Sequence, residues 1–576
     1  MAEIGSIGLG TVVSVSHHGE IQSLDGIPIL HWGIRADDRW HIARDEKAVR
    51  QGISPDGISI ETRLRVPGGD IVHRANVTNH KGVSLVTVEI ENETPVAVAL
   101  ALFTSSSGIV ESEADTLSVG GCPFVRASKP IALFGRASSE EDLLTMVGSE
   151  KMQRTNSPAP MEGEHVAIVF PLPHATTIRF VIQVDATQLL IPAPDELPSP
   201  EAIAKGWSVH FEQGGSVELQ DSRLQNALTT ARRHLLIGSE QEPTSTYWKH
   251  GVPSYAVPIA VIALCAWGHK TAAKRLLLRA IESQAVTVFQ NPDLKEISYL
   301  LWACNEYLEF NESHEDAEMI KSWAMEQIVH LIGAIPRWRK RRNQDFSWLY
   351  LGLESSSSLL QKKDEEVAAR QIREALSRVT QKRLVSTGQA SLETAINDEH
   401  RSSRLLLQQL NRYINGSSGE GTFDESLANT QATYSFASKQ RLQDPLASAL
   451  FLLAARRSFV TEPVGNTPKV AIFEGFSSLW FNVPVEVKNM PVHKGTIGYV
   501  IRWHGDRPAL LWEGKVGAEV TFIAPTLDPD WESTENVGET LFPQQLPKET
   551  IVSLVSPEVR KGDDPASGTQ SGNTFT

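Results

Sequence analysis

Hydrophobic and polar residues alternate with a period of two over the first 220 residues of the chain. Residues 57–66 read GISIETRLRV and residues 83–92 read VSLVTVEIEN, and turn segments such as PGGD and ENETP separate runs of this kind. Strict alternation places every second side chain on one face of a strand. We see no convincing amphipathic helix between these runs, so the pattern predicts a large antiparallel β-sandwich. A stiff, proline-rich strap at residues 192–200 leaves it.

The hydrophobic period changes to that of an amphipathic helix near Asp221. Residues 222–238 form the first predicted helix, with Asp221 or Ser222 as its cap and Gly238 as its stop. Short breakers such as WGHK and FNES make consecutive helices antiparallel neighbours. Further helices are predicted at residues 257–267, 269–284, 294–310, 316–335, 347–361, 365–379, 398–413 and 445–459.

Two of these helices, residues 257–267 and 294–310, are apolar over most of their circumference. Such a helix must be covered on all sides, as an inner helix of a double ring is. We therefore expect the middle of the chain to form a ring of paired helices, of which the pattern identifies about ten.

The period of two returns after residue 467, in segments such as GTIGYVIRWHG at residues 495–505. The predicted organisation is an N-terminal β-sandwich at residues 1–200 and a helical domain at residues 201–465. A small C-terminal β-sandwich follows at residues 466–555. The tail at residues 556–576 lacks large apolar clusters and is predicted to be disordered.

Composition excludes several classes of function. A net charge of −15 disfavours a general nucleic-acid binder, and the basic run RWRKRR at residues 337–342 is typical of a solvated helix end. No window reaches the roughly 18 apolar residues that span a bilayer, and a secretory leader is not evident, so we expect a cytoplasmic protein and no membrane partner. The sequence leaves the oligomeric state open.

Motifs for cofactor and metal chemistry are missing from the sequence. The three cysteines, Cys122, Cys265 and Cys304, show neither a disulfide framework nor zinc spacing. The sequence also lacks a glycine-rich phosphate loop, an HExxH motif and a nucleophile elbow. We therefore expect no cofactor and no bound metal.

Several segments resemble the six-hairpin glycosidases, which include bacterial glucoamylases, sugar phosphorylases and rhamnosidases. The helix pair AVPIAVIALCAWGHKTAAKRLL (256–277) and the helix NPDLKEISYLLWACNEYLEF (291–310) resemble early helices of their toroids. QDFSWLYLGLESSSSLLQKKDEE (344–366) resembles a later acidic-aromatic segment, and residues 475–513 resemble their C-terminal sandwich. The resemblance implies an (α/α)6 toroid and an α-linked glucan or oligosaccharide substrate. Glucoamylase-type toroids place an Arg-Asp pair where this chain reads YWKHGVPSYAVP (247–258), so that pair is missing.

Glycosidic cleavage needs one carboxylic acid and one carboxylate that face the same pocket. Asp345 precedes a predicted helix and is the best candidate acid, with Phe346 and Trp348 as aromatic platforms. The alternative is that Asp345 caps the helix that starts at Ser347 and that Trp348 belongs to the core. Glu354 lies two turns into that helix and is a further candidate, although an ordinary solvated residue fits that position as well.

The partner carboxylate is predicted in the flexible loop GSSGEGTFDES at residues 416–426. It offers Glu420, Asp424 and Glu425, and an acidic connection without function is the alternative. Asp293 is expected to cap a helix. A polar-aromatic cluster precedes another helix and fits either a carbohydrate site or an interdomain seam; it comprises Tyr247, Trp248, Lys249 and His250.

Two functions follow from these candidates. The first is a glycoside hydrolase-like enzyme, or a phosphorylase, with Asp345 as the acid and Glu420, Asp424 or Glu425 as the base. The second is a non-catalytic carbohydrate-binding or scaffold protein that retains the toroid, which the missing Arg-Asp pair and the short loops favour.

Overall fold

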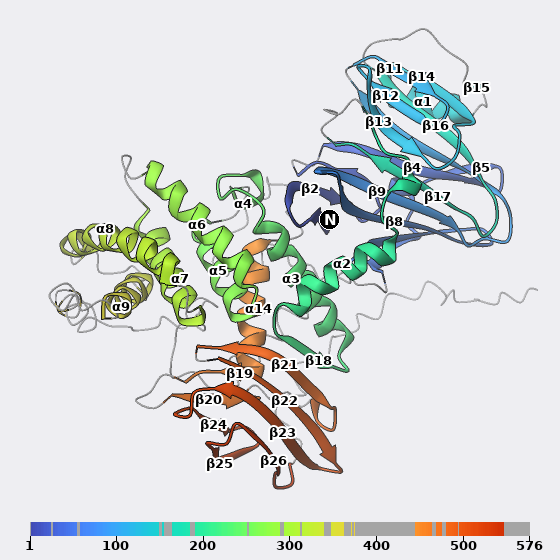
Figure 1. The fold of residues 1–576 in the computed structure, drawn as a ribbon. Helices are drawn as coiled ribbons and strands as arrows, with labels where there is room; N and C mark the ends of the chain where they lie inside the picture. Colours follow the sequence, from blue (N-terminus) through green and yellow to red (C-terminus); the bar gives the residue numbers. More distant parts are fainter. Residues whose placement is uncertain are drawn as a thin grey trace, which may run out of the picture.

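The fold is taken from a computed structural model (Figure 1). The structure describes residues 2–24, 27–54, 58–106, 108–148, 152–154, 164–184, 190–249, 253–287, 293–311, 314–338, 347–361, 370, 372, 374, 444–463, 468–474, 480–493 and 495–545. The predicted helices at residues 365–379 and 398–413 and the tail at residues 556–576 lie largely or wholly outside these ranges.

The N-terminal part is a sandwich of two antiparallel sheets, as the alternating pattern predicts. Alternate strand residues from both sheets fill one shared hydrophobic core, which includes Trp32, Val88 and Phe180. The first sheet has the order β1 (Ala2–Ser6), β2 (Leu9–Val15), β3 (Ile21–Gln22), β4 (Pro28–Ala36), β10 (Val98–Ser106), β16 (Glu164–Leu172), β14 (Leu133–Ala137) and β15 (Gln153–Arg154), with β5 (Arg39–Ile42) paired to β4. The second has the order β11 (Val110–Glu113), β12 (Thr116–Val119), β13 (Cys122–Ala127), β17 (Thr177–Ile182), β9 (Val83–Asn92), β8 (Gly69–His80), β7 (Ile60–Val66) and β6 (Val49–Ile53).

Two helices interrupt the region that we expected to hold only strands. Helix α1 (Glu140–Gly148) packs its buried residues Leu143 and Val147 on β14 and β16. Helix α2 (Pro200–Glu212) begins where the proline-rich strap ends, with Ser199 as its cap and Pro200 in its first turn. Both helices bury only two residues each, so their hydrophobic periodicity is too weak to stand out from the flanking strands.

The central helices follow the predicted bounds closely. Asp221 caps the first of them through Leu224 N–H, and Asp444 caps the last through Ala447 N–H. The described helices of this region are α3 (Ser222–Gly238), α4 (Thr246–Lys249), α5 (Ala256–Ala266), α6 (Lys270–Thr287), α7 (Leu294–Phe310), α8 (His314–Trp338), α9 (Ser347–Gln361) and α14 (Pro445–Phe459). Every residue of α5 is buried, as expected for a helix with apolar residues all round.

The C-terminal part consists of a five-stranded and a four-stranded sheet. Their core is continuous with that of the helices, because Phe451 and Phe459 of α14 join the same cluster as Phe473 and Tyr499. The larger sheet has the order β18 (Ser216–Leu219), β21 (Val485–Val492), β22 (Gly495–His504), β23 (Arg507–Val516) and β26 (Val537–Leu541). The smaller has the order β19 (Val460–Thr461), β20 (Lys469–Ile472), β24 (Thr521–Ala524) and β25 (Asp528–Ser533).

Strand β18 precedes the helices in sequence but pairs with β21 near the end of the chain. The helices from α3 to α14 therefore lie in sequence between two strands that pair in one sheet. This pairing brings the two ends of the helical segment to the same sheet. In Figure 1 the C-terminal sheets lie below the helices, and the N-terminal sandwich lies beside α2 and α3.

Helices α5 and α7 run side by side in the same direction. Ser254 and Tyr255, just before α5, contact Asp293 and Tyr299 at the start of α7. At the opposite end, Phe310 of α7 packs on His493 in the turn between β21 and β22. The N-terminal ends of both helices therefore lie together, and their C-terminal ends face the five-stranded sheet.

Helix α9 crosses α7 in the first half of each helix. A Cβ atom on Gly352 would lie 2.7 Å from Cβ of Ser298, so only glycine permits this approach. On the other side of α5, the late helix α14 packs against both α5 and α3, and Trp267 Nε1 donates to the carbonyl of Leu452. The order of neighbours is α14, α5, α7 and α9, and α6 and α8 pack against members of this row.

Candidate functional site

A polar contact fixes the N-terminal ends of α5 and α7 relative to each other. Asp293 caps α7, because its Oδ1 accepts from the N–H groups of Lys295 at 2.9 Å and Glu296 at 3.4 Å. Its Oδ2 accepts from Ser254 Oγ at 2.8 Å, just before α5. The capping role expected for Asp293 is confirmed, and the same carboxylate also joins the two helices.

An aromatic and cationic cluster lies directly beside this contact. The rings of Tyr255 and Tyr299 stack with centroids 5.1 Å apart. Lys295 Nζ lies 3.9 Å from the centroid of Tyr255 and 5.8 Å from that of Tyr299. Tyr255 is half-buried and Tyr299 is buried, so Tyr255 is the more exposed ring of the pair.

The cluster continues as a stripe along one face of α7. Lys295, Tyr299, Trp302, Glu306 and Phe310 follow each other at spacings of three or four residues, which places their side chains on one helix face. Trp302 Nε1 donates to Glu306 Oε1 at 3.1 Å. Tyr255, Lys295 and Tyr299 are not among the site residues predicted from the sequence. The spacing along residues 294–310 could have pointed to Lys295 and Tyr299, but Tyr255 lies outside that helix.

Glu306, near the end of the stripe, belongs to a charged cluster beside the five-stranded sheet. Burial alone would raise its pKa, but the hydrogen bond and the charge of His493 hold the pKa of Glu306 below its ordinary value. Glu462 lies on the other side of the same imidazole and pairs with Arg456 of α14 at 3.0 Å. Two carboxylates thus flank one histidine at the C-terminal end of α7.

Most of the predicted catalytic and substrate-binding residues lie outside the described residues. These are Asp345, Phe346, Glu420, Asp424, Glu425 and His250. Lys249 is the last residue of α4, and Trp348 lies in the first turn of α9. Glu354 is exposed on α9, two residues beyond the contact of Gly352 with α7.

Tyr247 and Trp248 are buried beneath α3. Tyr247 Oη donates to the carbonyl of His234 at 2.8 Å, and Trp248 Nε1 donates to the carbonyl of Gly238 at 3.1 Å. Both rings therefore anchor the segment before α5 to the end of α3, beside the contact of His234 with the N-terminal sandwich.

A serine, a histidine and a glutamate line up at that contact. His234 Nδ1 lies 3.0 Å from Ser448 Oγ, and His234 Nε2 lies 2.9 Å from Glu3 Oε2. The hydroxyl of Ser448 donates to the carbonyl of Asp444, so His234 must donate to Ser448 rather than withdraw its proton. All three side chains are buried, and the group is a structural ion pair between β1, α3 and α14.

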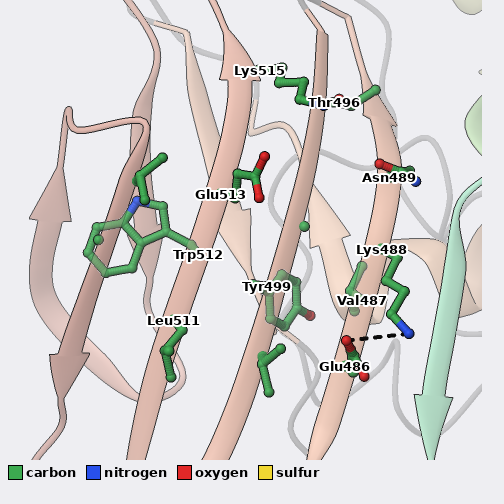
Figure 2. A pocket seen from close by; sticks show the side chains of 14 residues that line it. Glu486, Val487, Lys488, Asn489, Thr496, Tyr499, Leu511, Trp512, Glu513 and Lys515 are labelled. Atoms are coloured by element: carbon green, nitrogen blue, oxygen red, sulfur yellow. Dashed lines mark ion pairs between the residues drawn. The ribbon is translucent and has the colours of Figure 1, made fainter.

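A hollow of about 430 Å³ lies on the outer face of the five-stranded sheet (Figure 2). Gly498 of β22 lines it, next to the register shift between Val487 and Met490 of β21. Its rim carries two acidic and two basic side chains, Glu486, Lys488, Glu513 and Lys515. The aromatic residues of its lining, Tyr499 and Trp512, are buried, so the hollow lacks an open aromatic face for a sugar ring.

Neither a metal site nor a membrane-spanning helix is found in the described ranges. No group of three His, Cys, Asp or Glu side chains there is arranged to bind a metal ion. Among the same residues, no helix combines the length and hydrophobicity needed to cross a bilayer.

The comparisons with known proteins give distant structural similarities. No family model matches the sequence, and no curated protein matches it. The chain is similar to a bacterial glucoamylase solved in complex with acarbose, with a TM-score of 0.46 and 10% identity over 66% of this chain and 66% of that one, just under two thirds of its length. It is also similar to a polysaccharide lyase, with a TM-score of 0.19 and 7% identity over 77% and 82% of the two chains. At these values neither similarity transfers an activity to this protein.

Proposed function

We propose that this protein is a glycoside hydrolase-like enzyme that binds an oligosaccharide where the N-terminal ends of α5, α7 and α9 meet. Asp345 is the proposed acid, and Glu420, Asp424 or Glu425 is the proposed base. The observation that carries the proposal is the half-buried Tyr255 ring, stacked on Tyr299 beside Lys295 and Asp293 at these helix ends.

An (α/α)6 toroid is the proposed completion of the helical part. The row α14, α5, α7 and α9 supports it, because a ring requires the last helix in sequence to return to the first ones, as α14 does to α3 and α5. In this proposal the chain between α9 and α14 supplies the remaining helices.

The cluster at the helix ends has the chemistry of a saccharide site. A partly exposed aromatic face stacks on the C–H groups of a sugar ring, and nearby carboxylate and ammonium groups form hydrogen bonds with its hydroxyls. Asp345 would enter the same end, because it lies two residues before α9. Lys249 and His250 would enter it from the segment that precedes α5.

The proposed reaction uses two carboxyl groups roughly 5 to 10 Å apart. Asp345, protonated, donates its proton to the glycosidic oxygen as the bond to the anomeric carbon breaks. The second carboxylate activates a water molecule or attacks the anomeric carbon. Phe346 and Trp348 are proposed to pack on the sugar rings, and Glu354 to line the same end of the ring.

The test is turnover on a panel of aryl glycosides and oligosaccharides with the wild type and with Asp345→Asn. Loss of a general acid lowers turnover by about a hundredfold or more, so we expect that loss for at least one substrate. Asp530→Asn is the matched control, because Asp530 is exposed on β25, far along the chain from the helices. Turnover that survives Asp345→Asn unchanged would remove Asp345 as the acid.

A non-catalytic carbohydrate-binding protein is the second candidate function. Its support is that Asp293, a carboxylate at this end, is occupied in capping α7 and holding Ser254. Binding of oligosaccharides without turnover of any substrate, in the wild type as in Asp345→Asn, would favour it.

A further inference from the structure

His493 lies between two carboxylates from distant parts of the chain. It occupies the turn between β21 and β22, and its Nε2 lies 3.3 Å from Glu306 Oε2 of α7. Its Nδ1 lies 3.6 Å from Glu462 Oε1, and its backbone N–H donates to the same oxygen at 2.7 Å. Each ring nitrogen therefore faces an oxygen that can only accept while its carboxylate is ionised.

This geometry favours the charged imidazolium. A neutral imidazole has one N–H and one lone pair, so one of its nitrogens would point a lone pair at a carboxylate oxygen. The imidazolium donates from both nitrogens and balances part of the two negative charges. A neutral ring can donate to only one of the two carboxylates. Only the imidazolium therefore holds Glu306 and Glu462 at the same time.

The remaining charge near the imidazole belongs to Arg456 of α14. Its Nη2 pairs with Glu462 Oε2 at 3.0 Å and donates to the carbonyl of Pro491 at 2.7 Å. These bonds hold the turn to α14 at any pH near neutrality, since a guanidinium keeps its proton. The ring of Phe310 packs against the imidazole from the end of α7 without a charge of its own.

We propose that His493 is a pH-dependent latch between α7 and the turn of the β21–β22 hairpin. The latch is closed while the imidazole is protonated and bridges Glu306 to Glu462. Loss of the proton leaves one N–H for two carboxylates, so the neutral ring no longer bridges Glu306 to Glu462, while Glu462 stays bound to Arg456 and to the backbone N–H of His493.

The direction of the pH dependence follows from the charges around the ring. Burial would lower the pKa of His493, but the hydrogen bond to Glu306 and the charge of Glu462 outweigh burial and Arg456 and raise the pKa above its ordinary value. A raised pKa in the closed state stabilises the contact at acid pH, and this stabilisation is lost as the pH rises through that value. His493 is 35% exposed, so protons reach it without unfolding.

Hydrogen exchange of the full-length protein between about pH 5.5 and 9.5 tests the latch. After correction for the intrinsic exchange rate, we expect the opening constant of residues 300–310 and 485–504 to rise with pH. The total rise should be about tenfold for each unit by which the closed state raises the pKa of His493. His493→Gln should be open throughout, and His493→Lys, which keeps a cation over this range, should stay closed.

Two further variants separate the latch from a general loss of stability. Glu306→Gln removes one carboxylate, so the midpoint of the opening should move to lower pH. His504→Gln, an exposed histidine of β22, should leave the midpoint where it is in the wild type. A wild-type profile without a pH-dependent step, or one that persists in His493→Gln, would overturn the proposal.

Discussion

Glu3 and His234 form an ion pair that is removed from water where β1 meets α3. Replacing Glu3 by glutamine keeps the shape of the side chain but leaves the buried imidazole without its counter-charge. Removing one partner of such a pair costs roughly 3 to 5 kcal/mol, and we expect a loss of this size in the free energy of unfolding from urea denaturation. Glu113→Gln, at an exposed position of β11, is the control and should change the free energy of unfolding little. Equal stability of the two variants would contradict the role given to this pair.

At the level of elements, the contact between α7 and α9 depends on one glycine. An alanine at Gly352 would bring its Cβ within 2.8 Å of Ser298 Cα as well as Ser298 Cβ, both on the facing helix. Overpacking of this kind costs about 1 to 3 kcal/mol, so Gly352→Ala should lower the melting temperature. In Gly206→Ala the new methyl group meets no atom within 4 Å in α2 and replaces a helical glycine, so a neutral or slightly stabilising effect is expected. Similar melting temperatures for both variants would show that α9 does not pack as described.

The helices were predictable from the sequence where local signals were strong. The bounds of α7, α9 and α14 agree with the sequence-based prediction to the residue, because aspartate caps and apolar periodicity mark α7 and α14 and the apolar run alone marks α9. The pairing of β18 with β21 was not predictable, since its partner lies more than 260 residues away and leaves no local signature. The same holds for Tyr255 and Tyr299, which come together only because α5 and α7 run parallel.

At the scale of the whole molecule, the sandwich, the helices and the C-terminal sheets occur in the predicted order. The helices and the C-terminal sheets share one hydrophobic core, whereas the N-terminal sandwich has its own. Helix α3 connects the helical part to the N-terminal sandwich. His234 contacts Glu3 of the sandwich, and Arg233 donates to the carbonyl of Ile58. The N-terminal ends of α5 and α7 face away from the five-stranded sheet, which Phe310 at the other end of α7 approaches through His493.

Titration calorimetry of the wild type and two variants with an oligosaccharide measures whether a saccharide binds at the N-terminal ends of α5 and α7. Tyr255→Ala removes the half-buried ring and should weaken binding by roughly tenfold, as loss of an aromatic contact does. Leu511→Ala, in the hollow of the five-stranded sheet, should bind like the wild type. Unchanged affinity of Tyr255→Ala together with weakened binding of Leu511→Ala would contradict the account and place the ligand on the sheet.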